Sequence, residues 1–342
     1  MFNTSHLSSN CPKAPVSLVT IKAVVACLFF ITFPLALLLN GVSLWVSLHL
    51  RSISTFIVYL KNLSMADLLM TLSIPPMAAS MLPAATYEVK VLNCRYFSVI
   101  FYTSLYTSIA LMGLISVDRF FKIVRPCGKV LGQNVIFSII SSSLVWIVIF
   151  GGTAIPTVIL TDQAPINKSH NFCMSMKGPA GLSLHNSVVT FMETLFWLVS
   201  TLVVFCYICI TVRVLQSFRN SGSNNNQGKK KTKLRVFSIL LVFFVCFAPL
   251  HLLRIPFTLH QIFNIQVCSV EWVQILHELT VWVASTNACL DPFLYISLCK
   301  DYRGKLTDMM KPRMETHTPL STDTLSSSSW GIPGHSQVRE DT

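Results

Sequence analysis

Long apolar runs recur along the chain, and short polar stretches separate them. Each run is close to the roughly 20 residues that a helix needs to cross the hydrocarbon core of a bilayer. The runs lack the strict alternation of a membrane β-barrel and end at turn residues such as Pro83, Gly128 and Gly222. The pattern predicts an all-α membrane protein with a seven-transmembrane helix bundle. The predicted spans are centred within residues 23–48, 56–82, 96–117, 135–160, 188–212, 236–259 and 272–299.

The segments outside the spans predict the remaining organisation. The stretch 300–311, KDYRGKLTDMMK, carries Tyr302, Leu306, Met309 and Met310 on one helical face, which indicates a short amphipathic helix on the membrane surface after the seventh span. Residues 18–311 form the membrane domain, and 1–17 form an outer arm. The tail 312–342 is rich in Ser, Thr, Pro and Gly, so we expect it to be disordered. Its candidate phosphorylation sites are Thr316, Thr318, Ser321, Thr322 and residues 326–329.

Composition agrees with a membrane protein and gives the chain an orientation. The chain is 52% hydrophobic and 12% charged, and its net charge is +12. The cations gather in short segments, 119–129 and 213–235, where Lys and Arg mark the cytoplasmic side of a membrane. We therefore expect contact with membrane lipid and no nucleic-acid partner, with the N-terminus outside and the C-terminus inside.

The predicted outer segments carry sequons and cysteines. Asn3 and Asn167 begin glycosylation sequons, and glycosylation is expected only on the outer face. Four cysteines lie in or beside this oxidising side, and they allow three pairings. Cys94 with Cys173 is the favoured pair, which leaves Cys11 with Cys268.

Several charged and amide side chains lie inside the predicted spans, where a charge costs roughly 3 kcal/mol at mid-helix. Asp118 and Arg119 are adjacent at the inner end of the third span. They can form an ion pair there, and Arg119 can also turn away from Asp118 to contact a partner. Glu193 is a further carboxylate, in the fifth span. The remaining four side chains form a predicted hydrated cluster and a candidate Na⁺ site: Asn40, Asp67, Asn287 and Asp291.

The sixth span contains the stretch FVCFAPLHLLRIPF, residues 244–257. Pro249 cannot donate a backbone hydrogen bond, so it should kink the helix and act as a hinge. His251 and Arg254 share one helical face on the outer side of this hinge, and Gln261 lies two turns further on.

Other basic and aromatic residues fall at a similar depth. Taken singly, each tyrosine or histidine is as well explained by core packing. Together they predict a basic, aromatic-walled pocket that opens to the outside and takes an anionic ligand with a flat ring. We expect no cofactor. The additional residues are Lys90, Tyr102, Tyr106, Lys177, His185, His277 and Glu278.

The chain resembles the rhodopsin-like (class A) G-protein-coupled receptors in a series of motifs. In order along the chain, these are Asn40, MAD, Cys94, DRF, Trp146, Tyr207, CFAP and DPFLY. The resemblance implies a plasma-membrane receptor that is not an enzyme, couples to a heterotrimeric G protein, and meets arrestin and receptor kinases through its tail. It also implies a set of residues for activation and coupling: Asn40, Asp67, Asp118, Arg119, Tyr207, Phe247, Pro249, Asn287, Asp291, Pro292 and Tyr295.

The chain also resembles the purinergic receptors over longer stretches, such as SVIFYTSLYTSI, KGPAGL and STNACLDPFLY. Within these receptors, it is most similar to the subgroup that responds to ADP and UDP-sugars and to the orphan relatives of that subgroup. The resemblance implies an extracellular nucleotide or nucleotide-sugar-like ligand and an inhibitory-class G protein. The matching positions of the nucleotide site are Tyr102, Lys177, His185, His251, Arg254 and Gln261.

Two positions depart from that subgroup and leave the ligand open. His277 and Phe172 stand where these relatives usually have Lys. A neutral imidazole is a weaker phosphate anchor, so the ligand could carry fewer phosphates or be a lysophospholipid or other anionic lipid. A transporter or channel is the alternative from another class, although no inverted repeat is visible. An intramembrane enzyme would need a motif such as H-E-x-x-H, which the chain lacks.

Overall fold

The computed structural model describes residues 18–50, 54–124, 134–164, 172–220, 226–263, 270–298 and 300–310, and every regular element in these ranges is a helix. The all-α prediction is therefore confirmed. Several predicted features lie outside the described residues: Asn3, Cys11, Asn167, Cys268 and the tail 312–342. The side chains of Gln261 and Tyr295 are likewise outside the description.

The helices follow the predicted spans closely, and two of them contain a wider, π-helical stretch. Their bounds are α1 (Leu18–Leu48), α2 (Thr55–Met81), α3 (Tyr87–Leu92), a π-helical turn (Asn93–Phe97), α4 (Ser98–Val124), α5 (Val135–Trp146), a second π-helical stretch (Ile147–Ala154), α6 (Ile155–Ile159), α7 (Phe172–Ser175), α8 (Pro179–Asn220), α9 (Asn226–Phe263), α10 (Val270–Ser285), α11 (Asn287–Leu298) and α12 (Lys300–Met310).

Six helical segments in the described part of the chain are long and apolar enough to cross a membrane. The seventh crossing is divided between α10 and α11, which a single residue, Thr286, separates. Each of these two helices is shorter than the roughly 20 residues that a span requires, but their combined length is sufficient. The seven predicted spans are therefore all present, with an unpredicted break in the last.

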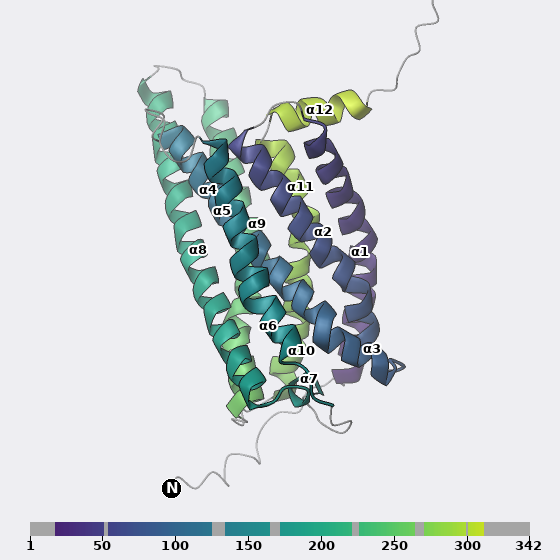
Figure 1. Cartoon of the computed structure of the whole chain (residues 1–342). Helices are drawn as coiled ribbons and strands as arrows, with labels where there is room; N and C mark the ends of the chain where they lie inside the picture. Colours follow the sequence, from purple (N-terminus) through teal and green to yellow (C-terminus); the bar gives the residue numbers. More distant parts are fainter. Residues whose placement is uncertain are drawn as a thin grey trace, which may run out of the picture.

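The spans pack side by side into one bundle (Figure 1). α3 and α7 lie at one end of the bundle, and α12 crosses the opposite end (Figure 1). Tyr302 of α12 is buried there, and its hydroxyl shares a 2.9 Å hydrogen bond with Ser43 of α1. Leu306 and Met309 pack against the same apolar cluster, which confirms the predicted amphipathic helix.

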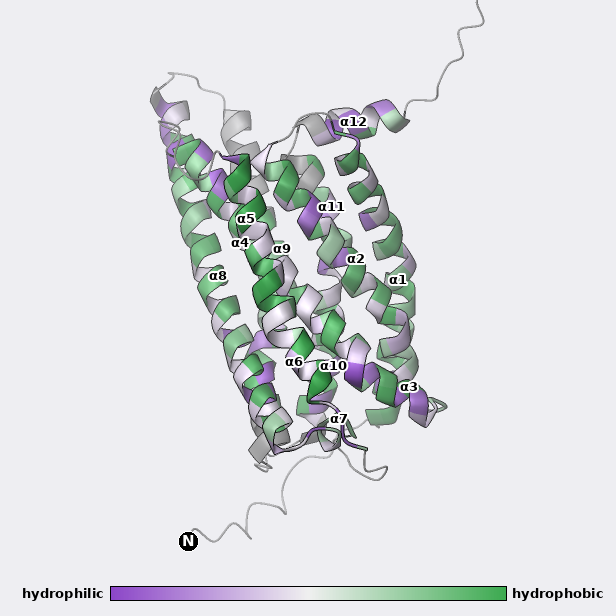
Figure 2. Cartoon of the chain, viewed as in Figure 1, coloured by the Kyte–Doolittle hydropathy of each residue, from purple (hydrophilic) through white to green (hydrophobic). Residues whose placement is uncertain are grey.

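Apolar residues cover most of the length of the spans, and hydrophilic residues gather toward the ends and on α12 (Figure 2). Large apolar side chains such as Ile31, Leu38 and Ile147 are more than 60% exposed. In water such exposure would be unfavourable, whereas in a bilayer these side chains meet lipid tails. The outward faces of the helices therefore fit a membrane, and the polar side chains turn inward.

Inside the bundle, polar side chains satisfy backbone groups that proline leaves free. Pro292 of α11 has no N–H, so the carbonyl of Ala288, four residues earlier, loses its helical donor. The Asn40 amide of α1 donates to this carbonyl at 2.7 Å. Because Asn40 is completely buried, this bond ties α1 to α11 in a place that water does not reach.

Glycine permits a close contact at the start of α8. A Cβ atom on Gly181, in the first turn of α8, would lie 2.5 Å from the backbone oxygen of Leu160 at the end of α6. Gly181 therefore lets α8 begin directly against α6. This contact fixes the start of the helix that carries His185.

Candidate functional site

A cavity of about 730 Å³ opens at the end of the bundle that carries α3 and α7. All seven spans contribute to its wall, through residues of α1, α2, α4, α6, α8, α9 and α10. A volume of this size suits a small organic ligand. The predicted pocket therefore exists at the predicted end of the membrane domain.

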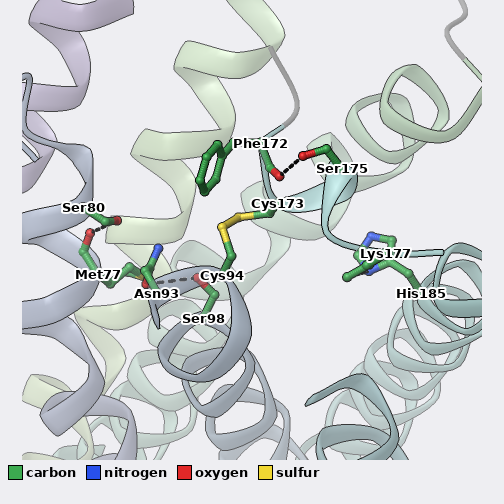
Figure 3. Close-up of a disulfide and its surroundings, with 10 residues drawn as sticks. All are labelled: Met77, Ser80, Asn93, Cys94, Ser98, Phe172, Cys173, Ser175, Lys177 and His185. Atoms are coloured by element: carbon green, nitrogen blue, oxygen red, sulfur yellow. Dashed lines mark hydrogen bonds between the residues drawn. A yellow bond between two sulfur atoms is a disulfide. The ribbon is translucent and has the colours of Figure 1, made fainter. Parts of the chain in front are cut away.

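A disulfide holds the segment beside the cavity. Cys94, in the π-helical turn before α4, is bonded to Cys173 of α7, and their Cα atoms are 5.2 Å apart (Figure 3). Both cysteines line the cavity. The ring of Phe172 next to Cys173 packs edge-on against Tyr87 of α3 at 5.8 Å. The favoured cysteine pair is thus confirmed, and it fixes one wall of the pocket.

Arg254 of α9 supplies a permanent cation to the cavity wall. Its guanidinium carbon lies 4.6 Å from the ring centre of Tyr102 and 5.8 Å from that of Tyr106, both on α4. Arg254 Nε and Nη1 and the Tyr106 hydroxyl are buried and have no hydrogen-bond partner among the described residues. Since a buried unpaired donor is costly, this group of side chains is prepared to bind an anion.

His251 lies beneath the cavity and does not line it. Its ring is fully buried and stacks on Phe196 of α8 at 3.6 Å, with Tyr106 edge-on at 5.5 Å. Its Nδ1 donates to the Phe247 carbonyl at 2.8 Å, so the neutral ring has its acceptor at Nε2. The shared face with Arg254 was predicted correctly, but Phe196 and Tyr106 cover His251 in this structure.

Lys177 and His185 form a second polar position in the cavity wall. The Lys177 ammonium lies 3.2 Å from His185 Nδ1, and both residues line the cavity (Figure 3). Lys177 precedes the membrane-spanning part of α8. Burial, reinforced by the charge of Arg254, lowers the pKa of Lys177 to about 8. An anionic ligand would relieve both effects, because it would compensate the buried charge.

On the remaining wall, α10 presents His277 and Glu278. The imidazole of His277 stacks on Phe257 of α9, with ring centres 3.8 Å apart and nearly parallel. Glu278 lies 3.9 Å from the ammonium of Lys22 on α1. Lys22 thus balances the carboxylate of the cavity wall.

The C-terminal end of α4 shows a different ion pair from the one predicted. The Asp118 carboxylate accepts hydrogen bonds from Lys122, at 2.8 Å, and from Thr55 of α2, at 2.5 Å. The guanidinium of Arg119 instead lies 4.1 Å above the ring of Phe56. Lys122 follows Asp118 by one helical turn, so an i,i+4 pair has formed where we expected an adjacent one.

The predicted polar cluster is present in the middle of the bundle. Ser108 donates to Asp67 at 2.6 Å, Asn287 donates to Asp291 at 2.9 Å, and the two carboxyl groups interact with each other. Carboxyl and hydroxyl oxygens suit a hard cation, so Na⁺ remains a prediction. A small cavity of about 30 Å³ is lined by Asp291 and by Tyr207 of α8.

The structure brings most of the predicted ligand residues together. Those that line the cavity are Lys90, Tyr102, Tyr106, Lys177, His185, Arg254, His277 and Glu278. Three residues of these sites were not predicted from the sequence: Lys22, Phe257 and Lys122. A lysine near the outer end of the first span, an aromatic residue one turn after Arg254 and a cation four residues after Asp118 were the available signals.

Comparison with known proteins identifies the class to which this fold and cavity belong. Residues 39–295 match the family described as "7 transmembrane receptor (rhodopsin family)", which is three quarters of the chain. The chain therefore belongs to the rhodopsin family of seven-transmembrane receptors. It is a multi-pass plasma-membrane G-protein-coupled receptor for a small extracellular ligand and not an enzyme. Membership of this receptor family argues against the transporter, channel and enzyme alternatives.

Curated relatives narrow the position within that family. The chain is 38% identical to human purinoceptor 13 over 303 residues, which is 88% of this chain and 84% of the relative. It is 34% identical to bovine purinoceptor 14 over 314 residues, 92% and 93% of the two chains. A mouse protein, "G-protein coupled receptor 87", is 36% identical over 282 residues, 82% and 78%. The chain thus falls among the purinoceptors and their relatives.

Proposed function

We propose that the protein is a receptor for an extracellular nucleotide or nucleotide-sugar-like anion, and that it signals through an inhibitory-class G protein. The similarity to purinoceptors 13 and 14 supports a nucleotide. The observation that carries the proposal is Arg254, which lines the cavity beside Tyr102 and Tyr106 and whose buried Nε and Nη1 have no hydrogen-bond partner among the described residues. A guanidinium binds phosphate oxygens through paired donors, and the tyrosines offer flat surfaces to a base.

The orientation in the membrane forms part of the proposal. Disulfides form in oxidising surroundings, so the end that carries Cys94–Cys173 and the cavity faces outward. The basic segments 119–129 and 213–235 then belong to the cytoplasmic side. With this orientation, residues 1–17 are an outer arm and 312–342 an inner tail. The tail offers Ser and Thr residues to receptor kinases and arrestin.

A route for the signal runs from the cavity to the hinge proline. An anion on Arg254 would change the contacts of Tyr106, which packs against His251. His251 stacks on Phe196, and it binds the backbone of Phe247, two residues before Pro249. Ligand binding would thus bias the position of α9 about Pro249 and open the inner end beside Arg119, Tyr207 and Tyr295 for the G protein.

The test is G-protein activation in cells that express the full chain. ADP, UDP, UDP-glucose and a lysophospholipid are applied in turn, and Arg254→Ala is compared with wild type at matched surface expression. We expect at least one nucleotide to activate wild type and Arg254→Ala to abolish the response. Arg95→Ala is the control, because Arg95 lies at the same end but outside the cavity wall.

Three outcomes separate the alternatives. Activation by the nucleotide that is lost in Arg254→Ala and kept in Arg95→Ala supports the proposal. Activation by the lysophospholipid alone would replace it with a lipid receptor. An unchanged dose response in Arg254→Ala would remove Arg254 from the mechanism.

A further inference from the structure

Glu193 is a carboxylate within the membrane-spanning part of α8 to which the proposed function gives no role. It is only 8% exposed and does not line the cavity, although its neighbour Met192 does. A buried carboxylate in a membrane requires a compensating charge. Its location therefore calls for an explanation in terms of what surrounds it.

The compensating charge is Arg254. Glu193 Oε1 lies 3.9 Å from Arg254 Nε, which makes α8 and α9 partners at the depth of the cavity floor. This separation exceeds the 2.7–2.9 Å that is typical of a charge-assisted hydrogen bond. Neither Glu193 oxygen has a hydrogen-bond partner within the described part of the chain, and the same holds for Arg254 Nε and Nη1. The two side chains thus interact electrostatically without a hydrogen bond. Nε and Nη1 of Arg254 therefore keep their capacity to donate hydrogen bonds to a ligand.

The charges around the cavity divide into balanced and unbalanced groups. Among the described residues, Lys22 is paired with Glu278 and Arg254 with Glu193. Lys90 and Lys177 also line the cavity, and no carboxylate partner accompanies them in the described ranges. Glu193 therefore cancels much of the attraction that Arg254 would otherwise exert on an anion.

We propose that Glu193 is a specificity-determining residue: it is the counter-ion that the anionic group of a ligand must replace at Arg254, and it limits how much negative charge the site accepts. The inference rests on the proposed function. Like charges repel strongly where water is scarce, and a repulsive element of this kind discriminates between related ligands. Each further phosphate on a ligand adds its own repulsion from Glu193. The direct contact between the ligand's anionic group and Arg254, in contrast, is made only once.

The test uses purified full-length receptor and the mono-, di- and triphosphates of adenosine and uridine, without divalent cations. Affinity is obtained from the thermal stabilisation that each nucleotide produces. Glu193→Gln removes the charge and keeps the shape. We expect it to raise the affinity for every nucleotide that binds, about threefold for a monophosphate and on the order of tenfold or more for a triphosphate. Glu193→Asp, which keeps the charge, should retain the wild-type order of affinities.

A purely structural role predicts a different result. Removing the partner of a buried arginine lowers the stability of the ligand-free receptor, but by itself it does not make affinity rise with the number of phosphates. If wild type binds nucleotides and Glu193→Gln changes all affinities equally, lowers them or leaves them unchanged, the inference is wrong while the proposed function stands. If neither wild type nor Glu193→Gln binds any of these nucleotides or UDP-glucose, the proposed function is contradicted and the inference falls with it.

Discussion

At the scale of single residues, neighbouring side chains hold the charged and titratable groups of the cavity wall in place. Tyr102 supports the guanidinium of Arg254, Phe257 supports the imidazole of His277, and Lys22 balances Glu278. These contacts fix the orientation of the groups that would meet an anion. Preorganised groups lose less entropy when a ligand binds, so the supporting residues contribute to affinity beyond any contact that they make with the ligand.

Lys177 should make ligand affinity depend on pH. Its pKa is lowered to about 8 in the ligand-free receptor, so the ammonium is charged below that pH and loses its proton above it. We expect nucleotide affinity to fall by about tenfold between pH 7 and pH 9 if only the charged form binds well, since each pH unit beyond the pKa reduces the charged fraction tenfold. Binding to purified receptor across this range measures the effect.

The control for this pH dependence is Lys177→Arg, because arginine stays charged throughout the range. The variant should show a flatter affinity profile above pH 8. A profile that falls equally steeply in wild type and in Lys177→Arg would assign the titration to another group.

At the scale of helices, proline and its compensating partners decide how the spans are tied together. Asn40→Ala should lower the free energy of unfolding by about 1–3 kcal/mol, because the Ala288 carbonyl loses its donor in a dry interior. Pro292→Ala restores a backbone N–H four residues after Ala288. In the Pro292→Ala background the cost of Asn40→Ala should therefore be smaller.

Thermal unfolding of the two single variants and the double variant in detergent measures this coupling. Additive losses would mean that Asn40 stabilises the bundle by some contact other than the one to Ala288. Asn62→Ala is a suitable comparison, because the side-chain amide oxygen of Asn62 accepts a 3.0 Å hydrogen bond from the indole N–H of Trp146 at a site without proline. The cost of this substitution should therefore not depend on Pro292.

The disulfide beside the cavity gives a further prediction at this scale. Cys94 and Cys173 are 79 residues apart in sequence, and removing a link across so long a loop typically costs about 2–5 kcal/mol. Replacing both cysteines by serine should lower the unfolding temperature and surface expression. Cys27→Ser, at an exposed free cysteine of α1, is the matched control. Equal stability of the two variants would show that the disulfide does not hold the cavity wall.

The spans could be predicted from the sequence because a membrane helix leaves a long apolar signature. The break at Thr286 and the two π-helical stretches could not, since they depend on packing between helices. The pocket was predictable in outline, because helical spacing places Tyr102 and Tyr106 on one face. The covering of His251 by Phe196 was not, because that contact joins α8 to α9 and has no local signal.

At the scale of the whole molecule, the two ends of the helix bundle carry different polar sites. The cavity with Arg254 lies at one end, and the network of Asp118, Lys122 and Thr55 lies toward the other. Between them run the stacked rings beside Pro249 and the cluster around Asp67. An anion at the first site can influence a G protein at the second only if both bias the same change in the helices.

This coupling must be reciprocal. If nucleotide binding favours the G-protein-binding form, then a bound G protein must raise nucleotide affinity by the same factor, commonly about 5–150-fold. The most direct test is the affinity of purified full-length receptor for the activating nucleotide, measured with and without an inhibitory-class heterotrimeric G protein. We predict an increase on the order of tenfold with the G protein, and greatly weakened binding in Arg254→Ala under both conditions. Saturable binding that is the same with and without the G protein, or that survives in Arg254→Ala, would contradict the account.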